Sequence, residues 1–392
     1  MKILCFTPLP YGDGSGWWSR DLALTVRGFR TLGHEAWLVC QPTTHAQDPL
    51  GRPVLLISAE KAQSPEWWQK QKPDAVVLGL WTMPKYDTIR DAALSATARV
   101  VERCDSDGIR LPSCGHKMFF RNQITAAWDR APFGQKVLSG LIASGKCLVA
   151  EAVNPWMRHR LAQTLRRLPF FLAETPIAVD RLGALAESLG EDPRKFLQIP
   201  HPIDTDIFRL AMPMAPKRRR IVCVGRWQAR QKDWPLLRSA LQIFLDTHPD
   251  FDALVFGSGT PSASPHRRLL LAGLASPEKI SEALQNSQIL FFSSRYESFL
   301  LAGAEALCCG CSVVGPQEVV SSQYFASFFG GSPLTRRHPQ ALAHALHSEA
   351  EQWLEARRNP QVIASKAAAE FSYSHVAQSI LSIFQGMGES RA

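Results

Sequence analysis

Short apolar runs alternate with stretches of helical periodicity along the first half of the chain. Residues 2–10, 35–42, 74–81, 98–105 and 170–176 have the apolar, β-branched character of strands. Residues 19–34 and 178–190 show the three-to-four-residue spacing of amphipathic helices. Strand and helix in regular alternation predict a parallel sheet that is covered by helices on both faces.

A second series of the same kind begins near residue 220. Strands are predicted at 220–227, 252–259, 288–294 and 312–317, with helices at 235–248, 276–287 and 297–310. Prolines at 200, 202, 213 and 216 separate the two series and indicate a linker. The chain of 392 residues is thus expected to form two doubly wound domains, over 1–200 and 217–370.

Composition places the chain among ordinary globular proteins, with 45% hydrophobic and 20% charged residues. No apolar run approaches the roughly 20 residues that a membrane span needs, and the start is too short for a secretory segment. Cys5, Cys40 and Cys223 lie in apolar runs, which favours buried free thiols and a cytoplasmic location. Cys308 and Cys311 have the CxxC spacing, but no second Cys or His pair lies nearby in sequence.

The net charge of +9 is concentrated in residues 108–170, where ten Lys or Arg residues face only Asp129 and Glu151. This region is either a solvated basic face or a surface attracted to an anionic acceptor or to anionic lipid at the inner membrane face. Apolar and aromatic residues around Trp156 favour peripheral membrane contact. No nucleic-acid-binding motif accompanies the charge, so nucleic acid is not expected as a partner.

Two glutamates, Glu297 and Glu305, bracket seven small or apolar residues. A helix that begins near Ser298, with Ser298 as its N-cap, would direct unpaired amides at an anion. Its rise of ~1.5 Å per residue would separate the carboxylates by roughly 10–12 Å, the span of a nucleotide sugar. A carboxylate accepts two hydroxyl protons, so each suits a vicinal diol. Two solvated helix carboxylates remain the alternative.

Two cations accompany this pattern. Arg226 ends the predicted strand at 220–227, and Lys232 lies in the loop before the next helix. A diphosphate gains negative charge as it leaves a sugar, so fixed cations there stabilise the transition state more than the ground state. With both present no divalent metal is required, and the acidic pair Asp105 and Asp107 lies in the first domain.

These pieces together resemble the family 4 retaining glycosyltransferases of GT-B fold, in which two Rossmann-like domains face a central cleft. VGRW…QK (224–232) resembles the family's phosphate clamp, and SRYESFLLAGAEAL (294–307) resembles its Glu-x7-Glu signature. IPHPIDTDIF (199–208) resembles the entry to the second domain, and RGFRTLGHEAWLV (27–39) resembles the first helix and second strand. EFSYSHVAQSILSIFQ (370–385) resembles the terminal helix, which implies that 371–392 crosses back to the first domain.

The resemblance implies a metal-independent hexosyltransferase that uses a UDP- or GDP-sugar and no cofactor, on a glycan or lipid-linked acceptor. Arg226 and Lys232 would hold the diphosphate, Glu297 the donor sugar and Glu305 the ribose. The remaining donor-binding residues that it implies are Gly14, Gly16, Leu274, Ala275, Ser298, Phe299, Leu300 and Leu301.

The sequence also departs from the family pattern. Leu300 stands where the family usually has Gly, and His201-Pro202 replaces Asn-Gly. The first domain lacks the family's His at a strand end, so Asp105 is the candidate to assist the acceptor hydroxyl, although Asp107-Gly108 is also an ordinary turn signal. A non-catalytic nucleotide-sugar-binding or partner subunit is therefore the alternative function. A Rossmann dehydrogenase is disfavoured because YGDGSGWW (11–18) lacks the third glycine.

Overall fold

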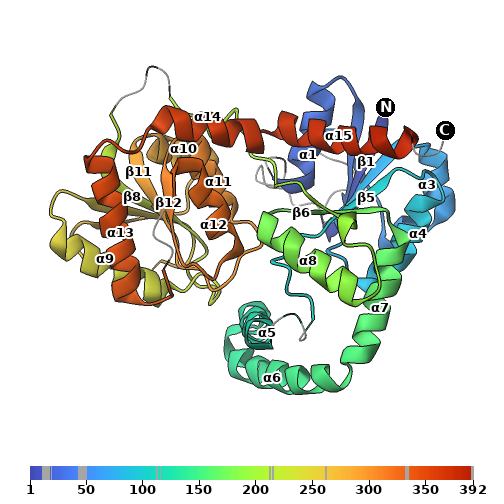
Figure 1. Ribbon diagram of the computed structural model, residues 1–392, viewed down its shortest axis with the longest axis horizontal. Coiled ribbons are helices and arrows are strands. Elements are labelled where there is room, and N and C mark those ends of the chain that lie inside the picture. Colours follow the sequence, from blue (N-terminus) through green and yellow to red (C-terminus); the bar gives the residue numbers. More distant parts are fainter. Residues whose placement is uncertain are drawn as a thin grey trace. The chain divides into compact units, whose positions relative to one another are not determined.

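The computed structural model describes residues 1–10, 18, 20–42, 51–111, 114, 116–211, 213, 216–260, 263–331 and 335–389. The chain divides into two compact units (Figure 1). The first comprises Met1–Cys114, Val153–Asp204 and Glu370–Ala392, and the second comprises Gly115–Ala152 and Thr205–Ala369. Residues 115–152, which sequence analysis placed in the first domain, group with the second unit.

A seven-stranded parallel sheet with the order β3-β2-β1-β4-β5-β6-β7 forms the centre of the first unit. Its strands are β1 (Lys2–Pro10), β2 (Glu35–Gln41), β3 (Val54–Leu56), β4 (Ala75–Leu78), β5 (Val100–Arg103), β6 (Phe170–Ala173) and β7 (Phe196–Gln198). Its helices are α1 (Asp21–Thr31), α2 (Ala59–Ala62), α3 (Pro65–Gln71), α4 (Asp87–Leu94), α7 (Asn154–Arg167), α8 (Pro176–Ser188) and α15 (Tyr373–Glu389).

Both faces of this sheet are apolar, as expected for a doubly wound unit. Ile3 and Cys5 of β1 pack in one cluster with Phe384 of α15, whereas Leu4 and Phe6 pack in another with Leu182 of α8. Helices α1 and α15 approach closely at Gly28, where an added Cβ would lie 2.2 Å from the carbonyl oxygen of Tyr373. A glycine at this position therefore allows the C-terminal helix to seat on the first unit.

A five-stranded parallel sheet with the order β10-β9-β8-β11-β12 forms the centre of the second unit. Its strands are β8 (Arg218–Val224), β9 (Asp252–Phe256), β10 (Leu269–Gly273), β11 (Ser287–Phe291) and β12 (Ser312–Val314). Its helices are α5 (His116–Arg130), α6 (Lys136–Ala152), α9 (Trp234–Thr247), α10 (Pro277–Gln285), α11 (Leu301–Cys308), α12 (Val320–Ala326) and α13 (Pro339–Leu354), and α14 (Pro360–Phe371) begins in it.

Most predicted strands and helices are present, so the two doubly wound sheets are confirmed. Periodicity missed the three-residue strands β3 and β7, because so short a segment shows no alternation, and it missed β10. It also gave no sign that α5 and α6 form an insertion between β5 and β6. None of the helices in the described residues combines the length and the apolar composition that a membrane crossing needs.

Candidate functional site

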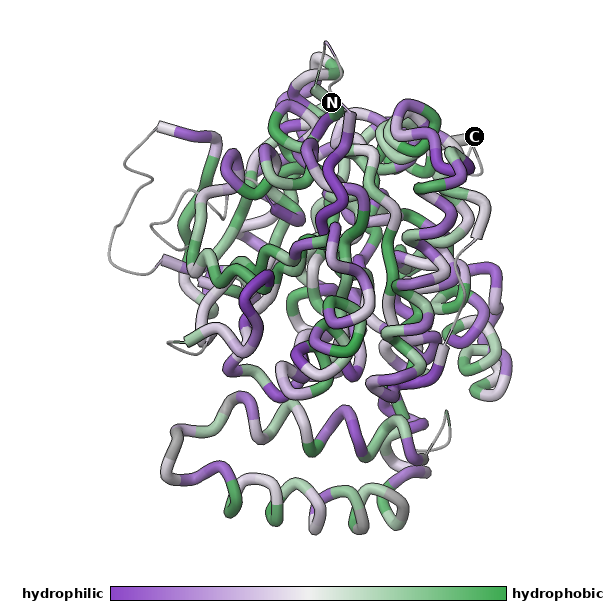
Figure 2. The backbone as a smooth tube through the Cα atoms, turned by 90° about the vertical axis from the view of Figure 1, so that its left-hand side faces the viewer, coloured by the Kyte–Doolittle hydropathy of each residue, from purple (hydrophilic) through white to green (hydrophobic). Residues whose placement is uncertain are grey.

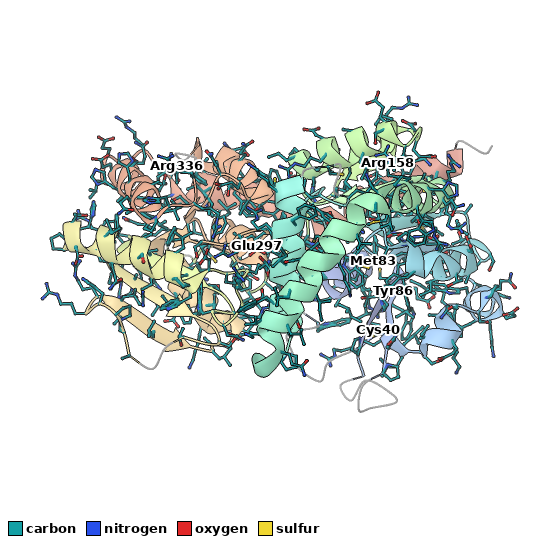
Figure 3. The ribbon with its side chains drawn as sticks, turned by 90° about the horizontal axis from the view of Figure 1, so that it is seen from below. Cys40, Met83, Tyr86, Arg158, Glu297 and Arg336 are labelled. Carbon is teal, nitrogen blue, oxygen red and sulfur yellow. The ribbon has the colours of Figure 1, made fainter. Side chains whose placement is uncertain are left out.

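The carboxyl ends of β8 and β11 are the place in the second unit where a ligand is expected. These neighbouring strands stand where the strand order reverses, and crevices at such points bind ligands in doubly wound folds. The loop after β8 carries Arg226 and Lys232, and the segment after β11 carries Glu297 (Figure 3). The topology thus brings the two motifs predicted from sequence to one edge of one sheet.

Lys232 and Glu297 are in direct contact. The Lys232 Nζ atom donates to Glu297 Oε1 at 2.5 Å, and the exposed fractions of the two side chains are 16% and 11%. Ser294 Oγ also donates to Oε1 at 2.6 Å, and Gln231 Nε2 donates to Oε2 at 3.3 Å. Glu297 is therefore held by three donors, and Lys232 is held within reach of anything that the carboxylate binds.

The loop that carries Lys232 is fixed from several sides. Ser293 Oγ donates to the Lys232 carbonyl at 2.7 Å, and the Arg295 amide donates to the Gln231 carbonyl at 2.7 Å. The buried Trp227 donates through its indole N–H to the Phe256 carbonyl at 2.9 Å. Such anchoring limits the reorganisation needed when a charged ligand binds.

Asp129 of α5 is a further anchor, which sequence analysis did not find. Its Oδ1 accepts the Arg230 amide at 2.6 Å, and its Oδ2 accepts the Gln231 amide at 3.0 Å. The Arg230 guanidinium lies 4.9 Å from the centre of the Trp128 ring. Helix α5 therefore binds the loop directly beside Lys232, an arrangement that no local pattern signals because about 100 residues separate the partners.

The structure describes some of the other predicted donor-site residues and leaves others outside the described residues. Arg226 is exposed at the end of β8, and Leu274, which is 80% exposed, and Ala275 lie in the loop between β10 and α10. Gly14 and Gly16 lie outside the described residues. The structure joins Lys232 to Glu297, and the parts played by the other residues stay predictions.

The expected helix start near Ser298 is wrong. Helix α11 begins at Leu301, and its N-cap is Leu300, which has left-handed backbone angles of φ 68° and ψ 77°. Ser298 is therefore not the N-cap residue, Glu305 lies about one turn inside the helix, and the helical rise does not give the separation of the glutamates. Phe299 and Leu300 are buried, so only their backbone groups are available to a ligand.

The left-handed conformation of Leu300 is one that glycine adopts without strain, which fits the glycine expected at this position from the resemblance. A left-handed residue other than glycine costs roughly 1–2 kcal/mol, because Cβ crowds the backbone. Here the leucine side chain is 6% exposed, so burial of its apolar surface offsets that strain.

A second cluster lies at the carboxyl edge of the sheet in the first unit. Asp105 follows β5, Glu174 follows β6, and His201 follows β7. His201 Nε2 lies 3.4 Å from Asp105 Oδ1 and 3.9 Å from Glu174 Oε1, while its Nδ1 lies 3.4 Å from Asp21 Oδ1. Sequence analysis noted His201 only as a departure in the linker and missed its place beside Asp105.

Buried polar groups hold this cluster in place. Glu174 Oε1 accepts the Asp105 amide at 2.9 Å, and Oε2 accepts the Ser106 amide at 3.2 Å. The buried Arg103 donates to the carbonyls of Ile199 and Pro200 at 3.2 and 3.1 Å, just before His201. Asp105 has a positive φ of 41°, a conformation that costs energy and gathers at functional sites.

The surroundings shift two pKa values in this cluster. Burial raises the pKa of Glu174 to about 7 against the opposing charge of His201. Burial alone would lower the pKa of His201, but the hydrogen bond of Asp105 and the charges of Asp21, Asp105 and Glu174 outweigh it and raise that pKa. Both groups therefore favour their protonated forms more than free side chains do.

This cluster also lines a small cavity of about 70 Å³ in the first unit. Its lining includes Thr7, Arg20, Asp21, Trp81, Asp105 and His201. The ligand-type atoms of Asp105, Glu174 and His201 lie within 4.8 Å of one another, as in a metal site. Each Glu174 oxygen already accepts one amide, and the raised pKa of His201 favours the imidazolium, which must lose a proton before it can bind a metal. The arrangement fits a group that holds a proton better than it fits a metal ligand set.

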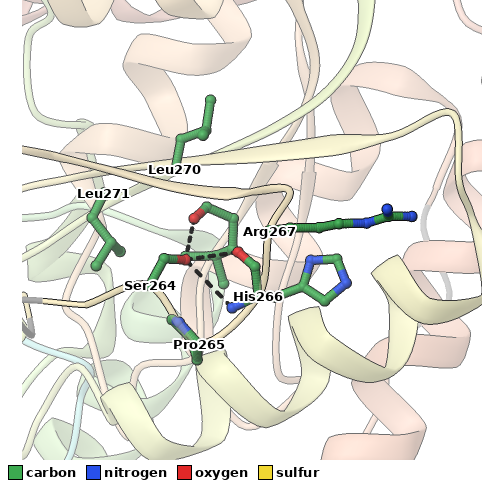
Figure 4. Close-up of a pocket in the computed structure, with 7 residues that line it drawn as sticks. Ser264, Pro265, His266, Arg267, Leu270 and Leu271 are labelled. Atoms are coloured by element: carbon green, nitrogen blue, oxygen red, sulfur yellow. Dashed lines mark hydrogen bonds between the residues drawn. The ribbon is translucent and has the colours of Figure 1, made fainter.

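Two other features carry no predicted site residue. A hollow of about 520 Å³ is lined by one segment between Ser264 and Leu271, where Ser264 Oγ donates to the carbonyl of His266 at 2.8 Å (Figure 4). All nine cysteines are free, and Cys308 and Cys311 are buried, which raises the pKa of each thiol. The expected buried thiols Cys5, Cys40 and Cys223 are confirmed.

Comparison with known proteins supports the fold and relates part of the second unit to a known family. Residues 218–348 match the family model described as "Glycosyl transferases group 1". A search by sequence similarity among curated proteins found no match.

Solved structures of similar fold cover nearly the whole chain. HepE of Anabaena in complex with UDP and glucose is 14% identical, with a TM-score of 0.62 over 98% of this chain and 100% of that one. Sucrose-phosphate synthase of Thermosynechococcus elongatus is 13% identical, with a TM-score of 0.62 over 99% of each chain. The lipopolysaccharide outer core galactosyltransferase WaaB is 13% identical, with a TM-score of 0.61 over the full length of both chains. Residues 218–348 are thus similar to the group 1 glycosyl transferases, and the chain has the GT-B fold of these solved structures.

Proposed function

We propose that this protein is a retaining glycosyltransferase, which moves a hexose from a UDP- or GDP-sugar to a hydroxyl of a glycan or lipid-linked acceptor. The observation that carries the proposal is the 2.5 Å contact of Lys232 with Glu297 at the switch point of the second sheet. The match of residues 218–348 to the group 1 glycosyl transferases supports the reaction class, and HepE, with UDP and glucose, supports the donor class.

In the proposed reaction the second unit binds the donor. Lys232, with the exposed Arg226, neutralises the diphosphate as the glycosidic bond breaks, so the leaving group needs no divalent metal. Glu297 accepts hydroxyl protons of the donor sugar, and Glu305 accepts those of the ribose. Backbone groups of Ser298, Phe299, Leu300 and Leu301 meet the phosphate or the sugar, and those of Leu274 and Ala275 meet the base.

For the acceptor we assign Asp105 a supporting role. Retention without an enzyme nucleophile implies attack on the face from which the diphosphate departs, with a phosphate oxygen taking the acceptor proton. Asp105, 39% exposed at its side chain, accepts a hydrogen bond from the acceptor hydroxyl, and His201 at 3.4 Å holds its orientation. The free buried thiols agree with a cytoplasmic location.

The test is a panel of UDP-, GDP- and ADP-sugars incubated with glycan and lipid-linked acceptors. We expect release of one nucleoside diphosphate together with a glycoside product whose anomeric proton coupling matches that of the donor, with activity unchanged by EDTA. Inverted product would contradict the retaining mechanism, and loss of activity in EDTA would contradict metal independence. Binding of a nucleotide sugar without turnover would favour the alternative, a non-catalytic binding or partner subunit.

A further inference from the structure

Among the described side chains of helix α6, five large apolar residues are exposed and four small residues are buried. The residues that it buries are Gly140, Ala143, Cys147 and Ala150, which recur every three or four positions on one face. An added Cβ at Gly140 would lie 3.4 Å from the Trp128 ring, so this face packs closely on α5. The opposite face exposes Val137 (66%), Leu138 (59%), Leu141 (66%), Ile142 (49%) and Val149 (59%).

This distribution is the reverse of that expected for a helix on a soluble domain. Each large aliphatic side chain left in water forgoes the favourable free energy of burying its apolar surface. Single exposed apolar residues are common, but five on one face of one helix form a continuous stripe. Helices α5 and α6 form a hairpin, and Figure 2 shows hydrophobic positions recurring along the backbone of its lower helix, α6. Such a stripe marks a surface that another apolar phase covers.

The charges around the stripe indicate which phase that is. Residues 116–152 contain five Lys or Arg residues, at positions 117, 121, 130, 136 and 146, and two acids, Asp129 and Glu151. Lys146 is exposed on α6 itself. Asp129 is bound to the amides of Arg230 and Gln231, so its charge is satisfied within the second unit. The hairpin therefore combines an exposed apolar face with a net positive charge, as interfacial helices do.

We propose that the apolar face of α6 docks this protein onto an anionic lipid surface. The helix lies flat, with the stripe among the acyl chains near the headgroups and Lys146 among anionic headgroups. Its 17 residues would extend about 25 Å along the interface at the α-helical rise. None of the stripe residues belongs to the proposed donor site, so vesicle binding can be tested without the transfer reaction.

Through α5, helix α6 is also in contact with the loop between β8 and α9, which carries Lys232. Helix α6 packs on α5, and Asp129 of α5 holds the loop beside Lys232 through two backbone hydrogen bonds. Lipid contact at α6 would thus hold the support of this loop in place.

The test is co-sedimentation of the whole chain with vesicles of phosphatidylcholine alone or of phosphatidylcholine mixed with phosphatidylglycerol. We expect the wild type to sediment with the mixed vesicles at least about 10-fold more strongly than with the neutral ones. The triple variant Leu138→Ser/Leu141→Ser/Ile142→Ser should lose about 10-fold or more of that binding, and Lys146→Glu should lose a smaller part.

The matched control is Leu354→Ser/Val362→Ser, which changes two apolar residues that are 50% and 47% exposed elsewhere on the second unit. This control should bind vesicles like the wild type. Circular dichroism of each variant establishes that it is folded. Equal binding of wild type and triple variant, or equal binding of the wild type to both vesicle types, would overturn the proposal. Loss of self-association in the triple variant without any lipid binding would overturn it in favour of a second copy of the chain.

Discussion

The carboxyl edges of the two sheets hold different kinds of charged cluster: an ion pair with a permanent cation in the second unit, and carboxylates around a histidine in the first. In the second unit Lys232 pairs with Glu297 on loops that follow neighbouring strands, and the adjacent Asp233 pairs with Arg295. In the first unit the carboxylates of Asp21, Asp105 and Glu174 surround His201. The pKa values of Glu174 and His201 are raised, so both groups keep their protons to a higher pH than free side chains do. A fixed ion pair suits a permanently charged ligand such as a diphosphate, whereas a proton-holding cluster suits a hydroxyl.

The largest effect is expected from breaking the ion pair of the second unit. Lys232→Ala should lower kcat/KM for sugar transfer by about 100- to 1000-fold, because a cation fixed at the leaving group stabilises the transition state. Glu297→Gln should lower it comparably, because the amide accepts fewer hydroxyl protons. Nucleoside diphosphate release measures both variants.

Lys279→Ala, an exposed lysine in α10, is the matched control and should retain wild-type activity. The melting temperature shows whether either site variant has lost its fold. Folded variants that keep wild-type kcat/KM would contradict the assignment of the second-unit site.

A smaller loss is expected from the first unit. Asp105→Asn should lower kcat by about 10-fold or more with little change in the KM for donor, since the amide orients the acceptor hydroxyl poorly. His201→Asn should lower kcat less and should shift the pH profile, because His201 acts through Asp105. The exposed Asp180→Asn serves as the control. An unchanged pH profile in the His201 variant would remove its positioning role.

The same cluster makes stability depend on pH. Glu174 binds its proton more tightly when folded, with a pKa of about 7 against 4.5, so the folded chain holds more protons between these values. Stability should therefore fall as pH rises from about 4.5 to about 7, and His201, with its raised pKa, should continue the fall above pH 6.5.

Scanning calorimetry of the wild type and Glu174→Gln across this range tests the prediction. The variant should flatten the fall in melting temperature between pH 4.5 and 7, while Glu187→Gln, an exposed change in α8, should leave it unaltered. A slope of the opposite sign in the wild type would show that other groups dominate.

The smallest effect concerns the free energy of unfolding of two variants at Leu300, where Gly should be more stable than Ala, the reverse of the usual order. Leu300→Gly should be more stable than Leu300→Ala by about 1 kcal/mol, because glycine relieves the left-handed backbone. At Leu307, inside the same helix, Ala should be more stable than Gly by about 1 kcal/mol. Urea unfolding of the four variants compares them, and the same order at both positions would show that Leu300 is unstrained.

The two sites also differ in how far the sequence could predict them. Lys232 and Glu297 follow long apolar strands, and their residue types at that spacing already indicate a diphosphate site. His201 and Asp105 are 96 positions apart, and β7, which positions His201, is too short to show periodicity. The helix start failed for a local reason: Ser298 is a good N-cap residue, but the left-handed turn at Leu300 delays the helix to Leu301.

The hairpin was the least predictable part of the molecule. Sequence analysis found the positive charge of residues 108–170, but charge alone does not show which face of a helix is exposed. That α6 turns its small residues toward α5 depends on the contact of Gly140 with Trp128, and that Asp129 anchors α5 depends on loop amides about 100 residues away.

The central claim is that Lys232, held by Glu297, binds the diphosphate of a nucleotide sugar, and calorimetric titration with UDP, GDP and ADP tests it most directly. We expect one of these nucleotides to bind the wild type, and Lys232→Ala to weaken that binding by about 10-fold or more while Lys279→Ala leaves it unchanged. The claim would be contradicted by a Lys232→Ala variant that is folded and binds the same nucleotide with wild-type affinity.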